Sequence, residues 1–154
     1  MKTFSGLEEF AAAAGTHLGY SDWRTITQEQ VDLFSEATDD HQWIHTDTDK
    51  ARSGPFGGPV AHGYLTLSLI PALMREIYRI EGLAMGINYG SNKVRFPSVV
   101  PVGSRVRAGA ELISCEPASQ GVRAVVGVTI EIEGSDKPAC AAEIVSLLHG
   151  RKDA

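Results

Sequence analysis

Acidic and histidine side chains are concentrated in one short stretch of this chain. Within eleven positions the sequence places Asp39, Asp40, His41, His45, Asp47 and Asp49. Three of the five histidines lie between His41 and His62, ahead of a long apolar run. A carboxylate and an imidazole that share one water can take a proton from it and deliver a proton to a neighbouring carbon. The stretch therefore predicts acid–base addition of water to a polarised double bond.

A metal site is the first alternative for this stretch, and its spacing does not fit one. The run from Asp47 begins like a calcium-binding loop, but its sixth position is Arg52 instead of Gly. Its twelfth position is Gly58 instead of Glu. His41 and His45 are four residues apart, yet helix-breaking residues surround them and no His-Glu-x-x-His pattern is present. We therefore expect no bound metal.

Covalent catalysis and nucleotide cofactors are also poorly matched by the sequence. Neither Cys115 nor Cys140 lies beside a helix start or a basic side chain, and no Gly-x-Ser-x-Gly turn occurs. The glycine-rich segment 54–58 lacks the Lys-Ser/Thr ending of a phosphate-binding loop. We therefore expect no cofactor. The negative charge that builds up on the carbonyl oxygen during water addition would then have to be stabilised by a hydrogen-bond donor, such as a backbone N–H group. Gly63, at the start of a buried helix, is well placed to supply one.

Composition and charge indicate one soluble domain spanning residues 1–154. The net charge of −5 excludes the broad positive field that nucleic-acid binding needs. Glu8 and Glu9 interrupt what would be a signal peptide, and the longest apolar run, 64–74, is about half of a membrane span. The two cysteines are too few for a disulfide framework and suit a reducing compartment. We therefore expect a cytoplasmic protein.

Helices occupy the first half of the predicted fold. Residues 7–14 favour a helix that stops at Gly15. Thr27 and Gln30 fit a capping box, and the helix they begin should turn three apolar residues to the core: Val31, Phe34 and Ala37. The composition of residues 39–59 is typical of a loop. Residues 61–80 predict a helix buried on nearly all sides, with Pro71 kinking or dividing it. Tyr64, Leu67 and Phe56 are expected either to belong to the core or to line an apolar ligand channel.

Strands occupy the second half. Residues 122–132 alternate apolar and other side chains at period two, and 106–112 do so more weakly. Segments 87–96 and 139–148 are also typical of strands, and glycine-containing turns separate them. Helices followed by hairpin-linked strands predict an α+β fold in which an antiparallel sheet curls around the buried helix.

The residues from Phe34 to His45 resemble the hydratase-2 motif of MaoC-like dehydratases. That motif reads approximately Phe-Ala-x-x-Ser/Thr-Gly-Asp-x-Asn-Pro-Ile/Leu-His. The segments 60–65 (Val-Ala-His-Gly-Tyr-Leu) and 94–97 (Val-Arg-Phe-Pro) also resemble the family, so that the likeness extends over residues 20–148.

This resemblance implies a hot-dog fold, in which an antiparallel sheet wraps a long central helix, and a homodimer. It implies syn addition of water to a trans-2-enoyl-CoA, which gives the (R)-3-hydroxyacyl-CoA. By motif position, Asp40 and His45 form the acid–base pair, and which of them is the acid stays open. The N–H of Gly63 would face the thioester oxygen, and Ser68 would be a polar helix residue near the site.

The sequence departs from the family motif at several positions. Asp39 replaces the usual Gly, and Gln42-Trp43 replaces Asn-Pro, although the amide of Gln42 can still orient the water or a catalytic side chain. These changes resemble the NodN-like branch. They leave the acid–base pair intact and the acyl-chain length open. Because a fold alone does not fix function, an acyl-ACP dehydratase, a thioesterase and a non-catalytic acyl-CoA-binding subunit remain alternatives. Four basic residues either hold CoA phosphates or are ordinary surface charges: Lys93, Arg95, Arg105 and Arg107. His62 is expected to brace the loop from the helix head.

Overall fold

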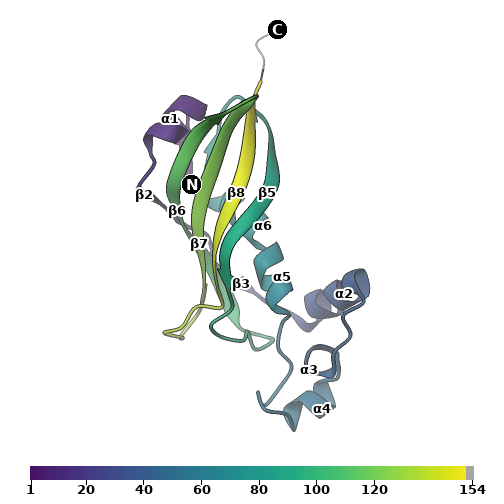
Figure 1. Ribbon diagram of the computed structural model, residues 1–154. Helices are drawn as coiled ribbons and strands as arrows, with labels where there is room; N and C mark the ends of the chain where they lie inside the picture. The colour runs from purple at the N-terminus through teal and green to yellow at the C-terminus, as the bar shows by residue number, and fades with distance from the viewer. Residues whose placement is uncertain (152–154) are drawn as a thin grey trace.

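A strongly curved antiparallel sheet forms the body of the protein in the computed structural model, which describes residues 1–151 (Figure 1). The strand order is β2-β6-β7-β8-β5, and β3 pairs with the first residues of β6. The strands are β2 (Thr16–Tyr20), β3 (Arg24–Thr25), β5 (Leu83–Arg95), β6 (Arg105–Ala118), β7 (Gly121–Ile132) and β8 (Cys140–Gly150). The predicted α+β fold with an antiparallel sheet is confirmed.

The alternation along β7 explains which face of the sheet is buried. Ala124, Val126, Val128 and Ile130 are buried, whereas the residues between them are half-buried or exposed. Side chains on a strand alternate between its two faces, so one face collects the apolar residues. That face packs on the helices and forms one hydrophobic core with them.

The predicted central helix consists of two short helices, α5 (Gly63–Ser68) and α6 (Ile70–Ile77), which lie against one face of the sheet (Figure 1). Pro71 lies in the first turn of α6, where its missing N–H costs no helical hydrogen bond. The division at this proline is as predicted. Only one side of each helix is buried, through residues such as Leu65 and Leu73.

The expectation that this run is buried on nearly all sides is therefore wrong. The side chain of Tyr64 is 70% exposed and that of Phe56 is 45% exposed, while Leu67 is half-buried. Apolar periodicity alone does not distinguish a side chain that faces the core of its own chain from one that lines a pocket or an unpartnered surface.

The first segments of the chain close one end of the sheet. β1 (Lys2–Phe4) pairs in parallel with β4 (Tyr78–Ile80), which directly follows α6. Helix α1 (Leu7–Ala12) is two residues shorter than the predicted 7–14. Phe10 of α1 stacks on Tyr78 and contacts the edge of Phe4, so three aromatic rings fix this end.

Helix α2 (Gln28–Thr38) begins at the predicted capping box. The Thr27 hydroxyl accepts from Gln30 N–H at 3.2 Å, and the Gln30 side chain accepts from Thr27 N–H at 3.0 Å. Val31 is buried as expected, and Phe34 is half-buried against the core. Ala37 is exposed, and Ser35 takes the buried position instead.

Two short helices occupy the region that was predicted to be a loop. They are α3 (Trp43–Thr46) and α4 (Thr48–Arg52), and the Asp47 side chain caps α4 by accepting from Lys50 N–H at 3.0 Å. Together with α2 they project beyond the end of the sheet (Figure 1). Within residues 1–151, no helix has the length and apolar character required to cross a membrane.

We predict that Thr27→Ala lowers the free energy of unfolding by about 1 kcal/mol, because it removes the side-chain acceptor for Gln30 N–H at the start of α2. Urea denaturation followed by far-ultraviolet circular dichroism measures the change. Thr27→Ser keeps the hydroxyl and is the matched control. Equal midpoints for the alanine and serine variants would contradict the prediction.

Candidate active site

His45 lies in α3 with its imidazole buried, whereas the adjacent residues Ile44 and Thr46 are half-buried. Its Nδ1 lies 2.6 Å from the carbonyl oxygen of Val60. A carbonyl can only accept, so Nδ1 carries the proton and Nε2 of the neutral ring keeps a free lone pair. Gln28 of α2 donates to the His45 carbonyl at 2.8 Å, which ties α3 to α2. The ring is thus held in one tautomer as a proton acceptor.

Asp40 follows the end of α2 directly. Asp39, the preceding residue, has a φ of 60° and ends the helix in the left-handed conformation. Asp40 is exposed, and its carbonyl oxygen lies 3.0 Å from Nε2 of His62. A carboxylate oxygen of Asp40 and one ring nitrogen each of His45 and His62 lie within 4.8 Å of one another. The structure therefore brings the two residues of the predicted acid–base pair together.

His62 completes this group from the residue before α5. Its ring stacks on that of His45, with centroids 3.8 Å apart and planes inclined by 26°. The expected bracing of the loop from the helix head is seen in its contact with Asp40. His62 also contacts Ser35 and Phe34 of α2, so it joins the two segments that carry the pair.

Gly63 lies next to this group, at the first position of α5. Thr66 N–H donates to the carbonyl of His62, which leaves the N–H groups of the first turn without helical acceptors. The Phe96 ring covers Gly63 so closely that a Cβ atom there would lie 3.2 Å from it. Any side chain at position 63 would displace the aromatic ring. The glycine therefore permits the Phe96 ring to pack directly on the helix start.

A pocket of about 230 Å³ lies between His45 and Gly63. Its lining is mainly apolar and comes from α3, the start of α5 and the segment after β5. The other lining residues are Ile44, Phe56, Val60, Ala61, Thr66, Phe96, Ser98, Val99, Val100 and Ala139. An apolar pocket with few polar groups is typical of a site that takes an apolar ligand with one reactive end.

Of the expected site residues, His45 and Gly63 line this pocket, whereas Asp40, Gln42 and Ser68 do not. Gln42 is exposed at the start of α3. The Ser68 hydroxyl donates to the carbonyl of Tyr64 one turn back, at 2.6 Å, and lines a separate hollow between α5 and β5. Their predicted roles remain predictions.

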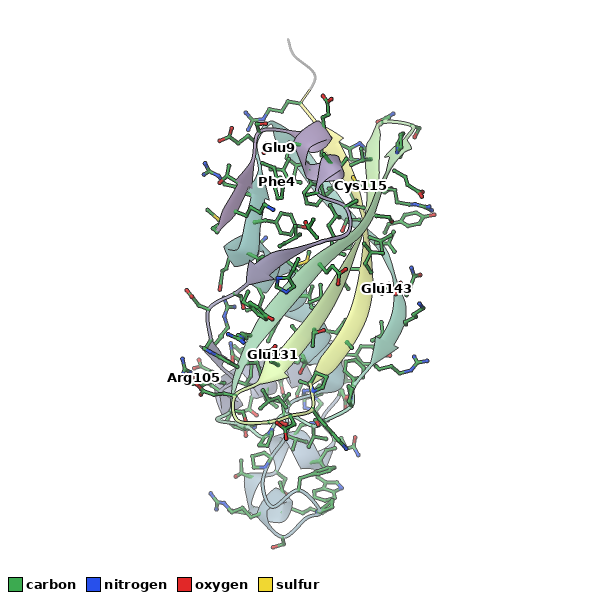
Figure 2. The ribbon with its side chains drawn as sticks, turned by 90° about the vertical axis from the view of Figure 1, so that its left-hand side faces the viewer. Phe4, Glu9, Arg105, Cys115, Glu131 and Glu143 are labelled. Atoms are coloured by element: carbon green, nitrogen blue, oxygen red, sulfur yellow. The ribbon has the colours of Figure 1, made fainter. Side chains whose placement is uncertain are left out.

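Three of the four basic residues considered for phosphate binding are engaged with acidic partners, and the fourth, Arg95, donates to the carbonyl of Val94 at 2.8 Å. Arg105 pairs with Glu133 at 2.9 Å, and Arg107 pairs with Glu131 at 2.7 Å. Lys93 lies 3.3 Å from Glu143. Figure 2 shows Arg105 and Glu131 toward one end of the sheet and Glu143 farther along it. These contacts favour the surface-charge interpretation for the three residues.

Asp40, His45 and His62 are also the one group among residues 1–151 whose spacing could suit a metal ion. Two imidazoles that bind one metal must each aim a lone pair at it from about 2.0 Å. Rings that stack at 3.8 Å direct their in-plane lone pairs side by side instead. The arrangement therefore fits proton transfer better than metal coordination.

Burial lowers the pKa of His45 below its ordinary value of 6.5. The hydrogen bond to Val60 and the charge of Asp40 act in the opposite direction, and repulsion from His62 adds to the lowering. A neutral imidazole is thereby favoured at neutral pH, which is the form that accepts a proton.

Comparison with known sequences identifies the family. The family described as "MaoC like domain" matches residues 9–133. The chain belongs to the MaoC-like family. The 3-hydroxyacyl-thioester dehydratase Z of Mycobacterium tuberculosis is 55% identical over 146 residues, which cover 94% of this chain and 97% of the relative. Nodulation protein N of Rhizobium leguminosarum is 41% identical over 147 residues, with 92% and 90% covered.

Solved structures agree with this MaoC-like assignment at the level of the fold. The unliganded R-hydratase of Pseudomonas aeruginosa superposes with a TM-score of 0.70 at 19% identity, over 92% of this chain and 88% of that one. The predicted family and the hot-dog arrangement are therefore confirmed.

Two features of this MaoC-like site were not assigned by sequence reasoning. The Val60 carbonyl, which fixes the His45 tautomer, carries no signal in the sequence because every residue has a carbonyl. Phe96 lies in a segment that resembles the family, but its contact with Gly63 depends on how the chain after β5 returns to the helix start. The family motif at 94–97 includes Phe96, but the motif alone does not indicate what the ring contacts.

We predict that native stability falls as the pH drops below 6.5 and that His45→Gln reduces this fall. The folded pKa of His45 is lowered, so the unfolded chain binds the proton first and the stability present above the unfolded value is lost on acidification. Urea denaturation at several pH values between 5 and 8 measures how the free energy of unfolding depends on pH in the native protein and in the His45→Gln variant. Parallel curves for the two proteins would contradict the assignment of a buried, neutral His45.

Proposed function

We propose that this protein is an (R)-specific enoyl-thioester hydratase, a hydro-lyase that also runs in the dehydration direction. The observation that carries the proposal is the neutral His45 ring, held by Val60 beside Asp40 and on the same pocket as Gly63. The dehydratase name of the mycobacterial relative supports the same reaction.

The acid–base pair acts on one water. Nε2 of His45 and the Asp40 carboxylate are both proton acceptors, so together they orient the water and remove its proton. The water oxygen bonds to C3 of the enoyl group, and the electron pair of the double bond moves toward the thioester. The pair then returns a proton to C2. Delivery of oxygen and proton from one side gives syn addition.

Gly63 supplies the charge stabilisation that this reaction needs. Negative charge develops on the thioester oxygen when the water oxygen bonds to C3, and a fixed N–H group at that oxygen lowers the barrier. The first-turn N–H of Gly63 has no helical acceptor. The Phe96 ring, which occupies the space that a Cβ atom would need, covers this helix start with an apolar group. The apolar pocket beside it takes the acyl chain.

The carrier is inferred to be CoA, with an acyl carrier protein as the alternative. The substrate is thus a trans-2-enoyl-CoA, and the product is the (R)-3-hydroxyacyl-CoA. Cys115 and Cys140 are free thiols, which is typical of a reducing compartment and supports the expected cytoplasmic location. Burial raises the pKa of both thiols, that of Cys140 to about 11.

A homodimer that forms along β5 is part of the proposal. β5 is the last strand of the sheet, so one of its sides lacks a partner strand among residues 1–151. Its exposed side chains include Met85, Ile87 and Tyr89, which are 52%, 43% and 66% exposed. Exposed apolar residues that cluster on an open edge mark an interaction surface. Pairing of β5 with the same strand of a second copy would cover both edges symmetrically.

We predict that Asp40→Asn and His45→Gln each lower kcat for crotonyl-CoA hydration about 100-fold or more, because each removes one proton acceptor from the water. The loss of enoyl absorbance after addition of purified protein measures the rate. Asp39→Asn is the matched control, because its carboxylate is almost fully exposed and asparagine tolerates the left-handed conformation.

Near-normal rates in either site variant would overturn the assignment of the pair. Circular dichroism and unfolding midpoints of all three variants separate loss of chemistry from loss of fold. Release of free CoA without loss of the double bond would show a thioesterase. Tight binding of a saturated acyl-CoA with no turnover of short or long enoyl-CoA would show a binding subunit.

We further predict that Ile87→Lys combined with Tyr89→Lys converts the protein from twice the 16.5 kDa chain mass to that of a single chain. Two charges on each β5 would face their counterparts across the symmetric interface and repel them. Light scattering coupled to size exclusion measures the mass. Ile113→Lys, an exposed change on β6 away from this edge, is the control and should leave the mass unchanged.

A further inference from the structure

The buried imidazole of His62 is not used by the proposed chemistry, although it contacts both residues of the acid–base pair. Its side chain is 2% exposed. Nε2 lies 3.0 Å from the Asp40 carbonyl oxygen and 3.2 Å from the Ser35 hydroxyl, and the ring stacks on His45. A buried titratable ring with these contacts can influence both the position and the pKa of the groups that it touches.

The hydrogen bonds fix the protonation of this ring. The Asp40 carbonyl can only accept, so Nε2 of His62 carries the proton. Nδ1 is buried and has no hydrogen-bond partner among the described residues. The tautomer of His62 therefore has its proton on the opposite nitrogen from that of His45.

We propose that His62 is a positioning residue for the acid–base pair: it anchors the main chain at Asp40, orients the His45 ring by stacking, and keeps the two imidazoles from being protonated together. This inference rests on the proposed hydratase function. It assigns His62 no contact with the substrate.

The anchoring follows from where the contacts lie. The Asp40 carboxylate is on an exposed segment, so the position of its main chain decides where the carboxylate points. His62 binds that main chain and is covalently joined to Gly63 at the helix start. It therefore fixes the distance between the pair and the proposed N–H donor. Misplacement of catalytic groups by about 1 Å can cost 100-fold in rate.

The electrostatic part follows from the stacking distance. The titratable groups that face His45 are His62 and Asp40. A proton on one of two rings with centroids 3.8 Å apart disfavours a proton on the other. Replacement of the His62 ring by an uncharged side chain removes this repulsion. The pKa of His45 should then rise.

Two variants separate the contributions of His62. His62→Phe keeps a ring that can stack on His45 but has no N–H for the Asp40 carbonyl. His62→Gln keeps an amide N–H near the place of Nε2 but has no ring. We expect His62→Phe to lower kcat by about 10- to 100-fold with little change in KM, and His62→Gln to retain more of the rate. Equal kcat in the phenylalanine variant and the native protein would overturn the positioning role.

A second measurement does not depend on turnover. Nitrogen-15 NMR of the imidazoles in the native protein should show His45 protonated on Nδ1 and His62 on Nε2 near neutral pH. The opposite tautomer at His62 would overturn the proposal without any variant. In both variants that fold, His45 should titrate at higher pH than in the native protein. An unmoved His45 titration would mean that His62 is only a packing residue.

These readouts also separate the two proposals. If the native protein adds no water to any enoyl-CoA, the hydratase function fails, while the tautomers and the His45 titration still decide how His62 acts on its neighbours. If hydration is observed and the His45 titration is unchanged by both substitutions, only the role of His62 fails.

Discussion

Two imidazoles in direct contact, both buried, form the constraint around which the site is built. Burial disfavours a positive charge on the His45 ring. A main-chain carbonyl fixes the tautomer of each ring: Val60 for His45 and Asp40 for His62. These two hydrogen bonds join the end of α2, the short helix α3 and the start of α5. Loss of either would leave a buried polar nitrogen unpaired, so the arrangement is kept by hydrogen bonding more than by apolar contact.

The sheet supports this group through the short segment before α5. Ala61 N–H donates to the Val100 carbonyl at 2.8 Å, and Val102 N–H donates to the Pro59 carbonyl at 2.9 Å. Residues 59–61 therefore connect the segment that follows β5 to the helices that project beyond the sheet. The pocket lies where these parts meet, with Val60 and Val100 both in its lining.

Local signals in the sequence predicted those features that depend on neighbouring residues. The capping box at Thr27, the division at Pro71 and the alternation along β7 are determined within a few positions. The region 39–59 was misjudged because its composition favours turns, whereas the Asp47 side chain caps a short helix there. Other features depend on contacts between residues that are far apart in the sequence. Gly63 and the Phe96 ring that covers it are 33 positions apart. The tautomers of His45 and His62 likewise depend on carbonyls from other segments of the chain. No local pattern carries such information.

The outer strand β5 has a consequence for how newly made chains avoid aggregation. Its pairing with β8 shifts register at three places, between Leu83 and Met85, Asn88 and Gly90, and Asn92 and Arg95. Lys93, inside the last of these irregular steps, has a φ of 52°. A regular, flat edge of thirteen residues would accept almost any extended peptide, whereas an irregular one offers continuous hydrogen bonding only to a strand of matching shape. The same irregularities that interrupt the sheet thus protect the chain from indiscriminate strand pairing in a crowded solution.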